Sequence, residues 1–205
     1  MAAAKRKERG GICGERRRVA SQEARELAEF ELEVAEEHLA LARTASPAVR
    51  PLLLFYGLFH LAKAAYALAT GNPLRERVHG LTCRLPEGRR PSSLSEVRVG
   101  LKAKGAFRLF EGLYDPHPIP AGVSFPLDEL VEGRGHAAKI PPLTRHYLAL
   151  FGLSHVARYE PELWRRALTG EDPASAALLP YLDRVAEECR HEVASVVERW
   201  QESQQ

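Results

Sequence analysis

Cysteine is scarce in this sequence. Its three cysteines, Cys13, Cys83 and Cys189, lie far apart and form no C-x-x-C pair. An odd number at such spacing excludes a disulfide framework and a thiolate zinc site, so a reducing compartment is expected. The first residues also lack the apolar run of a secretory signal. We therefore expect a cytoplasmic protein.

Recognised catalytic motifs are missing as well. The sequence contains no G-x-x-x-x-G-K-[ST] phosphate loop, no G-x-G-x-x-G, no H-E-x-x-H and no G-x-S-x-G. Asp115, His117 and His136 lie in a stretch rich in proline and glycine, but nothing in their spacing fixes a metal geometry. We expect no cofactor and no metal, and the absence of a catalytic motif favours a protein that is not an enzyme.

Charge of one sign is not in large excess, since 29 Lys and Arg residues against 27 Asp and Glu leave a formal net charge of +2. This value is too small to indicate a polyanion partner by itself. The excess of positive charge lies in residues 1–18, which hold almost no large apolar side chain. We predict a disordered basic tail there. We favour a solvated tail, and the alternative is a tail that contacts nucleic acid.

Only one long apolar run is present, residues 51–69, and Tyr56, His60 and Lys63 interrupt it near the middle. Ionisable groups there are costly in lipid, so the run predicts a buried core helix and no membrane association. Ser46 and Pro47 are expected to start this helix, and Gly71 to end it.

The remaining periodicity predicts a mainly α protein, a helical bundle with a small inserted β-hairpin, formed by residues 19–205 as a single domain. An amphipathic helix starts at Ser21, with Leu27, Phe30, Val34 and Leu41 on its apolar side. The hairpin is expected near residues 95–110, where apolar and polar residues alternate and Gly105 allows a turn. Further helices are predicted over 126–132, 142–159, 161–170 and 180–200.

Three polar clusters are candidate sites. The stripe Tyr56, His60 and Lys63 occupies one side of the central helix, because its spacings are four and three residues. The turn 79–84 follows a basic loop, and its glycine lets a ligand approach the backbone. The third cluster, with Arg158 and Glu160, ends the helix after Pro142. Each has a structural alternative: a core histidine, a capping turn, or charges that complement a helix dipole.

The run Val49–Ala64, VRPLLLFYGLFHLAKA, resembles the signature helix of YaaC-like bacterial proteins. The segments His79–Arg84, Glu96–Val99 and Arg158–Trp164 follow in the same order as in that family, so the resemblance covers most of the chain. It implies a bacterial cytoplasmic protein, but no particular reaction. It also implies these candidate ligand-binding residues: Arg50, Tyr56, His60, Lys63, His79, Arg84, Arg158 and Glu160.

The helical layout is also similar to HEPN-type bundles, which often act in RNA cleavage or in toxin and phage-defence systems. HEPN ribonucleases carry an R-x4-6-H motif, and Arg75 with His79 falls one residue short of it. This departure weighs against ribonuclease activity.

Three functions remain open. The first, which we favour, is a binding module for an anionic ligand, either a nucleotide or RNA, or for a partner protein; an oligomer is compatible with it. The second is a phosphodiester hydrolase, with His60, His79 and Arg84 as catalytic candidates. The third is an architectural subunit in which the polar groups satisfy one another.

Overall fold

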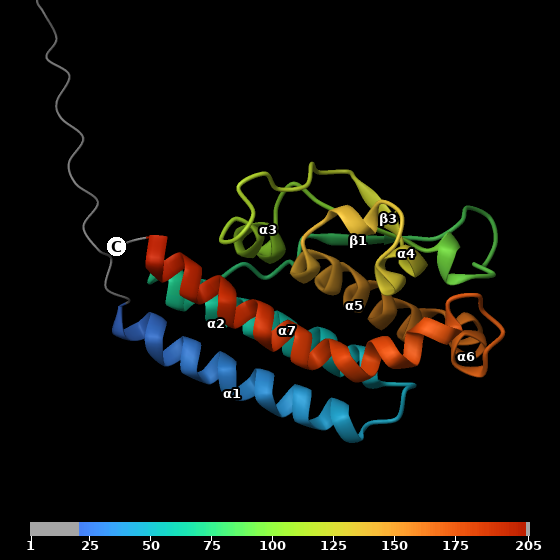
Figure 1. Cartoon of the computed structure of the whole chain (residues 1–205), viewed down its shortest axis with the longest axis horizontal. Coiled ribbons are helices and arrows are strands. Elements are labelled where there is room, and N and C mark those ends of the chain that lie inside the picture. The colour runs from blue at the N-terminus through green and yellow to red at the C-terminus, as the bar shows by residue number, and fades with distance from the viewer. Residues whose placement is uncertain (1–20, 204–205) are drawn as a thin grey trace, which may run out of the picture.

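The computed structural model describes residues 21–203, so the predicted basic tail lies outside the described residues. The fold is mainly α-helical with a small antiparallel sheet, as predicted (Figure 1). The helices are α1 (Gln22–Thr44), α2 (Arg50–Thr70), α3 (Ala106–Glu111), α4 (Leu127–Glu132), α5 (Pro142–Tyr159), α6 (Pro161–Thr169) and α7 (Ser175–Ser203). The strands are β1 (Leu81–Arg84), β2 (Arg98–Leu101) and β3 (Ser124–Pro126), and two short 3-10 helices are η1 (Leu94–Glu96) and η2 (Ala137–Lys139).

Helix α1 packs against α2 through small side chains. The predicted apolar side of α1 is wrong in part, because Phe30 is 59% exposed and Leu41 is 58% exposed. The buried positions of α1 are instead mostly alanines, which bring the two helix backbones close together: Ala24, Ala28, Ala35 and Ala42, with Glu31 and Leu39. A Cβ on Gly57 of α2 would lie 2.6 Å from Leu39 Cδ2, so this contact also needs a glycine.

Helix α2 is the central element and packs on α1, α5 and α7. It is long and apolar enough to cross a membrane, yet most of its apolar residues are buried in the protein, the arrangement of a core helix. Its predicted start at Ser46 and Pro47 is wrong: the helix begins at Arg50, and Pro51 is the proline of the first turn. Gly71 ends it in a left-handed conformation, as predicted.

The predicted β insertion is a three-stranded sheet in the order β1-β2-β3 rather than a two-stranded hairpin. Residues 106–110, expected to follow the turn at Gly105 as the second strand, form α3 instead. The strands that pair with β2 are more distant in the sequence. Val99 of β2 lies opposite Cys83 of β1 on one side and opposite Phe125 of β3 on the other. Such non-local pairing leaves no trace in the spacing of neighbouring residues. One face of the sheet lies on α5, where a Cβ on Gly152 would meet Val99.

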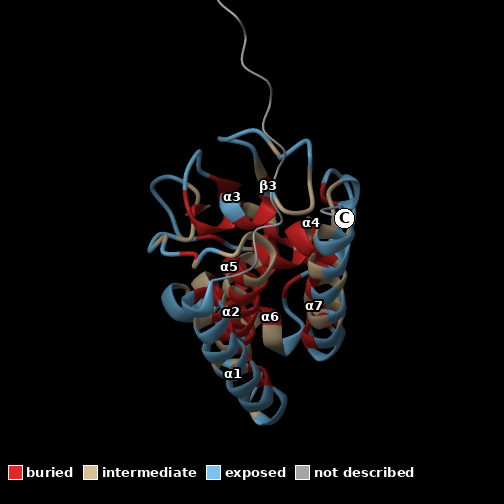
Figure 2. Ribbon diagram, turned by 90° about the vertical axis from the view of Figure 1, so that its left-hand side faces the viewer, coloured by how far each residue is buried: buried red, intermediate tan, exposed pale blue. Residues whose placement is uncertain are grey.

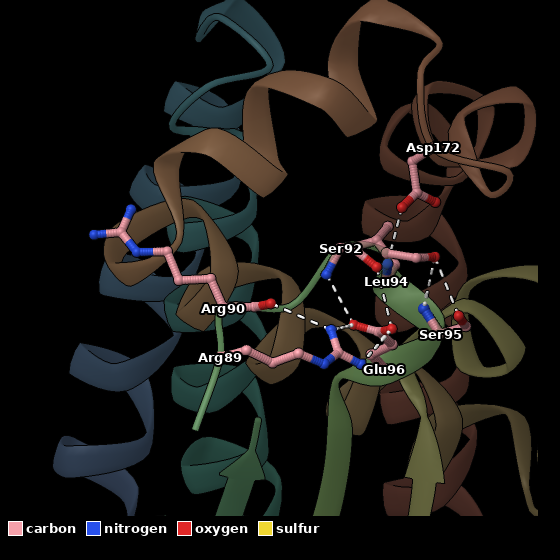
Figure 3. A network of polar contacts seen from close by, with 8 residues as sticks. Arg89, Arg90, Ser92, Leu94, Ser95, Glu96 and Asp172 are labelled. Atoms are coloured by element: carbon pink, nitrogen blue, oxygen red, sulfur yellow. Dashed lines mark hydrogen bonds and ion pairs between the residues drawn. The ribbon is translucent and has the colours of Figure 1, made fainter. Parts of the chain in front are cut away.

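The C-terminal helix starts earlier than predicted. Helix α7 begins at Ser175, so Pro180 lies inside it near its N-terminus. The buried carboxylate of Asp172 precedes the helix and accepts hydrogen bonds from the backbone N–H groups of Leu94 and Ala174, both at 2.9 Å. These two bonds tie the start of α7 to the segment before β2 (Figure 3).

The same segment is held by Glu96, which belongs to one of the family-like motifs. Its carboxylate accepts two hydrogen bonds from the guanidinium of Arg89, each 2.8 Å, and one from the backbone N–H of Ser92 (Figure 3). These bonds lower the pKa of Glu96 to about 2, with the Arg89 hydrogen bond as the largest cause. Glu96 therefore serves the loop before β2. The core lies where α2, α5 and α7 meet beneath the sheet, and the outer side of α1 faces solvent (Figure 2).

Candidate functional site

The turn that carries His79 is fixed by two glycines. The carbonyl of Val78 accepts a hydrogen bond from Ala106 N at 2.8 Å, which draws the turn onto the start of α3. At this crossing a Cβ on Gly105 would lie 2.5 Å from Gly80 N, and both glycines have positive φ, 82° at Gly80 and 136° at Gly105. Only glycine fits both constraints, so the glycine pair sets the position of His79.

The ring of His79 is held in one tautomer. Its Nδ1 accepts a hydrogen bond from Leu81 N at 3.1 Å, so the neutral ring carries its proton on Nε2. The ring packs on Phe151 of α5, with ring centroids 4.6 Å apart. Burial lowers the pKa of His79, and the charges of Lys102 and Arg158 lower it further. His79 is therefore a neutral hydrogen-bond donor at pH 7.

The end of α5 lies beside this turn. Arg158 is held by its own helix, since its Nε donates to Ser154 O at 2.9 Å. Its guanidinium carbon lies 5.1 Å from the centroid of the Tyr159 ring. Burial and the charge of Arg158 lower the pKa of His155, whose ring centroid is 4.8 Å from that of Tyr159. The second and third predicted clusters thus meet. We call His79, Lys102 and Arg158 the His79 site.

Two other side chains border the His79 site. Cys83 of β1 is half-buried, and burial, helped by the negative charge of Glu160, raises the pKa of its thiol to about 12. A thiol in this state is a poor nucleophile at neutral pH. Glu160 follows α5 directly and precedes Pro161 of α6. Its charge acts on the Cys83 thiol, and Glu160 takes part in no ion pair among residues 21–203.

The cations of the His79 site have no carboxylate partner within the described chain. Neither Lys102 nor Arg158 takes part in an ion pair there, although both are exposed. Nearby Arg75 pairs with Glu23, and Arg108 pairs with the buried Glu111 at 2.6 Å. The site therefore keeps two free positive charges beside a neutral histidine.

The polar stripe of α2 has a different environment. Glu31 of α1, which is 5% exposed, accepts hydrogen bonds from His60 Nδ1 and Lys63 Nζ, one on each carboxylate oxygen. The ring of His38 stacks on His60 with centroids 5.5 Å apart, and Tyr56, 38% exposed, lies on its other side. His60 and Lys63 are thus satisfied inside the α1–α2 interface, while Tyr56 remains exposed. Sequence reasoning missed Glu31, because a glutamate on a helix so rich in glutamate carries no signal of burial.

Arg50 and Arg84 lie apart from the His79 site. Arg50 donates to Asp183 of α7 at 2.5 Å and lines a pocket of about 110 Å³ between α1, α2 and α7. Arg84 is exposed and stands opposite Arg98 at the end of β1. Because side chains alternate along a strand, Arg84 points to the face opposite that of Cys83.

The histidines proposed as catalysts do not share a cavity in this arrangement. His60 is bonded to Glu31, and the contacts that lead from it to His79 run through the packed rings of Phe59 and Phe55. The pocket beside Arg50 contains neither histidine. Within residues 21–203 no group of three His, Cys, Asp or Glu side chains is placed to hold a metal ion.

One Arg–His pair does have the spacing R-x6-H, namely Arg184 and His191 on α7, and sequence reasoning overlooked it. Arg184 is not free, because its Nε lies 3.0 Å from Glu188 Oε1 and its guanidinium stacks over Tyr181. Glu188 also lies 3.3 Å from Nε2 of the buried His146. This network links α5 and α7.

A last motif residue connects distant helices. Trp164 of α6 is buried and donates its indole N–H to Ala48 O at 3.1 Å, which attaches α6 to the loop before α2. The chain is therefore a helical bundle with a three-stranded sheet on α5 and a polar site where the sheet meets the end of α5. Comparison with protein families gives the description YaaC-like Protein, matched over residues 4–133 and 125–197. The chain belongs to the YaaC-like family. No curated protein and no solved structure matches it, so the similarity to HEPN bundles stays a prediction.

Proposed function

We propose that this protein is a binding module for a phosphate-bearing anion, which binds at the His79 site. The observation that supports this proposal is the pair Lys102 and Arg158, two exposed cations that have no carboxylate partner within residues 21–203 and whose charges both act on the neutral His79. Phosphate oxygens accept hydrogen bonds from such donors, and a guanidinium can donate two of them at once.

Two of these donors, His79 and Arg158, are held in place by the protein, which favours binding. His79 is fixed by the Leu81 N–H, by Phe151 and by the glycine pair, and Arg158 is fixed by Ser154 O. A donor that is already ordered loses little side-chain entropy when a ligand binds. Glu160 lowers the net charge around the site, which suits a small anion better than a long polyanion held by charge alone.

The α2 stripe plays a structural role in this proposal. The ammonium group of Lys63 is paired with Glu31, so it offers little to an anion. The favoured function thus keeps two of the three predicted clusters and assigns the third to the architecture of the bundle.

Isothermal titration with inorganic pyrophosphate at low salt tests the proposal. Wild type should bind, and Arg158→Ala and Lys102→Ala should each weaken binding at least fivefold, since hydrogen bonds to charged groups contribute about 1.5–3 kcal/mol. Arg25→Ala on α1 is the matched control, because Arg25 is exposed and also has no ion-pair partner within residues 21–203. Native mass spectrometry of gently purified protein should detect a retained anion. Equal affinity in all four proteins would refute the proposal.

A further inference from the structure

The side chain of Tyr159 distinguishes the His79 site from a plain anion site. Tyr159 ends α5 and is 59% exposed, although it is a large aromatic residue. One part of its ring is in contact with the Arg158 guanidinium, and the ring of His155, tilted by 51°, supports it from the helix. The ring is therefore held in place by two neighbours while more than half of the residue remains open to solvent.

This arrangement places a stacking surface directly beside a cation. Nucleobases stack on exposed aromatic rings, and the adjacent phosphate is neutralised by lysine or arginine. Arg158 lies over the Tyr159 ring, and its helix α5 packs on His79 through Phe151, so the aromatic surface and the anion site share one helix. An inorganic anion would leave the aromatic surface unused.

We propose that the ligand of the His79 site is a nucleotide unit, with its base stacked on Tyr159 and its phosphate bound by Arg158 and Lys102. This inference rests on the proposed function and names its ligand class. The unit belongs either to a free nucleotide or to a single-stranded RNA, because both present the same base and phosphate.

The first measurement is the affinity of the full chain for ADP and for pyrophosphate, by titration at low salt. ADP should bind more tightly than pyrophosphate. Tyr159→Ala should weaken ADP binding roughly 5- to 100-fold, the range expected for loss of one stacked base, and leave pyrophosphate binding unchanged. Tyr159→Phe should retain nearly full affinity, because it keeps the ring. Phe30→Ala is the matched control, since Phe30 is also 59% exposed but lies on α1.

The second measurement separates the two sources of the nucleotide, by fluorescence anisotropy of a labelled adenosine 12-mer RNA. An RNA ligand should bind more tightly than ADP and lose affinity in Tyr159→Ala. Its affinity should fall with salt at a logarithmic slope of about −1.4 for two phosphate contacts, reduced by about 0.7 in Arg158→Ala. Tighter binding of ADP than of RNA, with the same dependence on Tyr159, would identify a free nucleotide.

The outcomes separate this inference from the function on which it rests. Pyrophosphate binding that depends on Arg158, with ADP no tighter and no effect of Tyr159→Ala, would overturn the nucleotide and keep the anion site. Equal losses of ADP affinity in Tyr159→Ala and Phe30→Ala would also overturn the nucleotide proposal. Absence of binding for pyrophosphate, ADP and RNA alike would overturn both proposals.

Discussion

Removal of the Glu31 charge tests the structural role of the α2 stripe. In Glu31→Gln, Lys63 keeps its charge but loses its carboxylate partner, and the amide can no longer attract two donors. Breaking a fully buried ion pair costs about 3–5 kcal/mol. The side chains of His60 and Lys63 are each 20% exposed and recover part of their hydration, so we expect about 2–3 kcal/mol. For a chain of 205 residues this corresponds to a Tm about 4–12 °C lower.

Thermal and urea unfolding, followed by circular dichroism at pH 7, measure this loss. Glu33→Gln is the control, because Glu33 is an exposed glutamate on the same helix, and it should leave both transitions unchanged. The double variant Glu31→Leu with Lys63→Met should recover much of the stability, since neither charge is then left unpaired. A loss below about 1 kcal/mol in Glu31→Gln would refute the reasoning, because it would mean that the carboxylate contributes no more than a surface pair.

Three further predictions concern packing, the site turn and pH. Gly57→Ala should destabilise the protein by about 1–3 kcal/mol in urea unfolding, because its Cβ would clash with the fully buried Leu39; wild-type stability would show that the helices can separate at no cost. Gly105→Ala should abolish pyrophosphate binding while the protein stays folded, because the added Cβ displaces Gly80 and the turn that holds the site. Full binding of pyrophosphate by this variant would refute the role of the glycine pair. Burial lowers the pKa of His146 to about 3, so the unfolded chain binds the proton more readily and stability is lost as the pH falls below 6.5. Between pH 6.5 and 5 the free energy of unfolding should fall by about 2 kcal/mol, and in His146→Gln this fall should be smaller by the same amount. An equal pH dependence in wild type and His146→Gln would contradict this prediction.

Local signals predicted the helical part of the fold well. Gly71 and Gly170 end their helices in the left-handed conformation, and the prolines at 142 and 161 begin theirs. Each of these residues acts on its own backbone, so its effect can be deduced from the sequence. The start of α7 was placed too late, because a proline is tolerated in the first turns and because Asp172, which holds the segment before the helix, bonds to the distant Leu94.

The candidate site could be predicted only as separate pieces. The sequence indicated the turn at His79 and the end of α5 through their residue types, but their meeting depends on the sheet lying on α5. Lys102 lies in the segment predicted as a hairpin and was not among the candidate site residues. Its place in the site follows from the bond between Lys102 N and Gly80 O, a contact between β1 and β2 that no local pattern contains.

The motif residues of the family differ in whether they have a partner inside the protein, and this difference separates two roles. Glu96 accepts from Arg89, Trp164 donates to Ala48, and Lys63 is paired with Glu31, so loss of any of these residues should first lower stability. Arg158 has no carboxylate partner within residues 21–203 and is held only by its own helix, so its loss should cost binding and little stability. A comparison of unfolding and pyrophosphate titration across these variants would test the division. If Arg158→Ala unfolded as readily as Glu31→Gln, an internal role for the His79 site would be the better explanation.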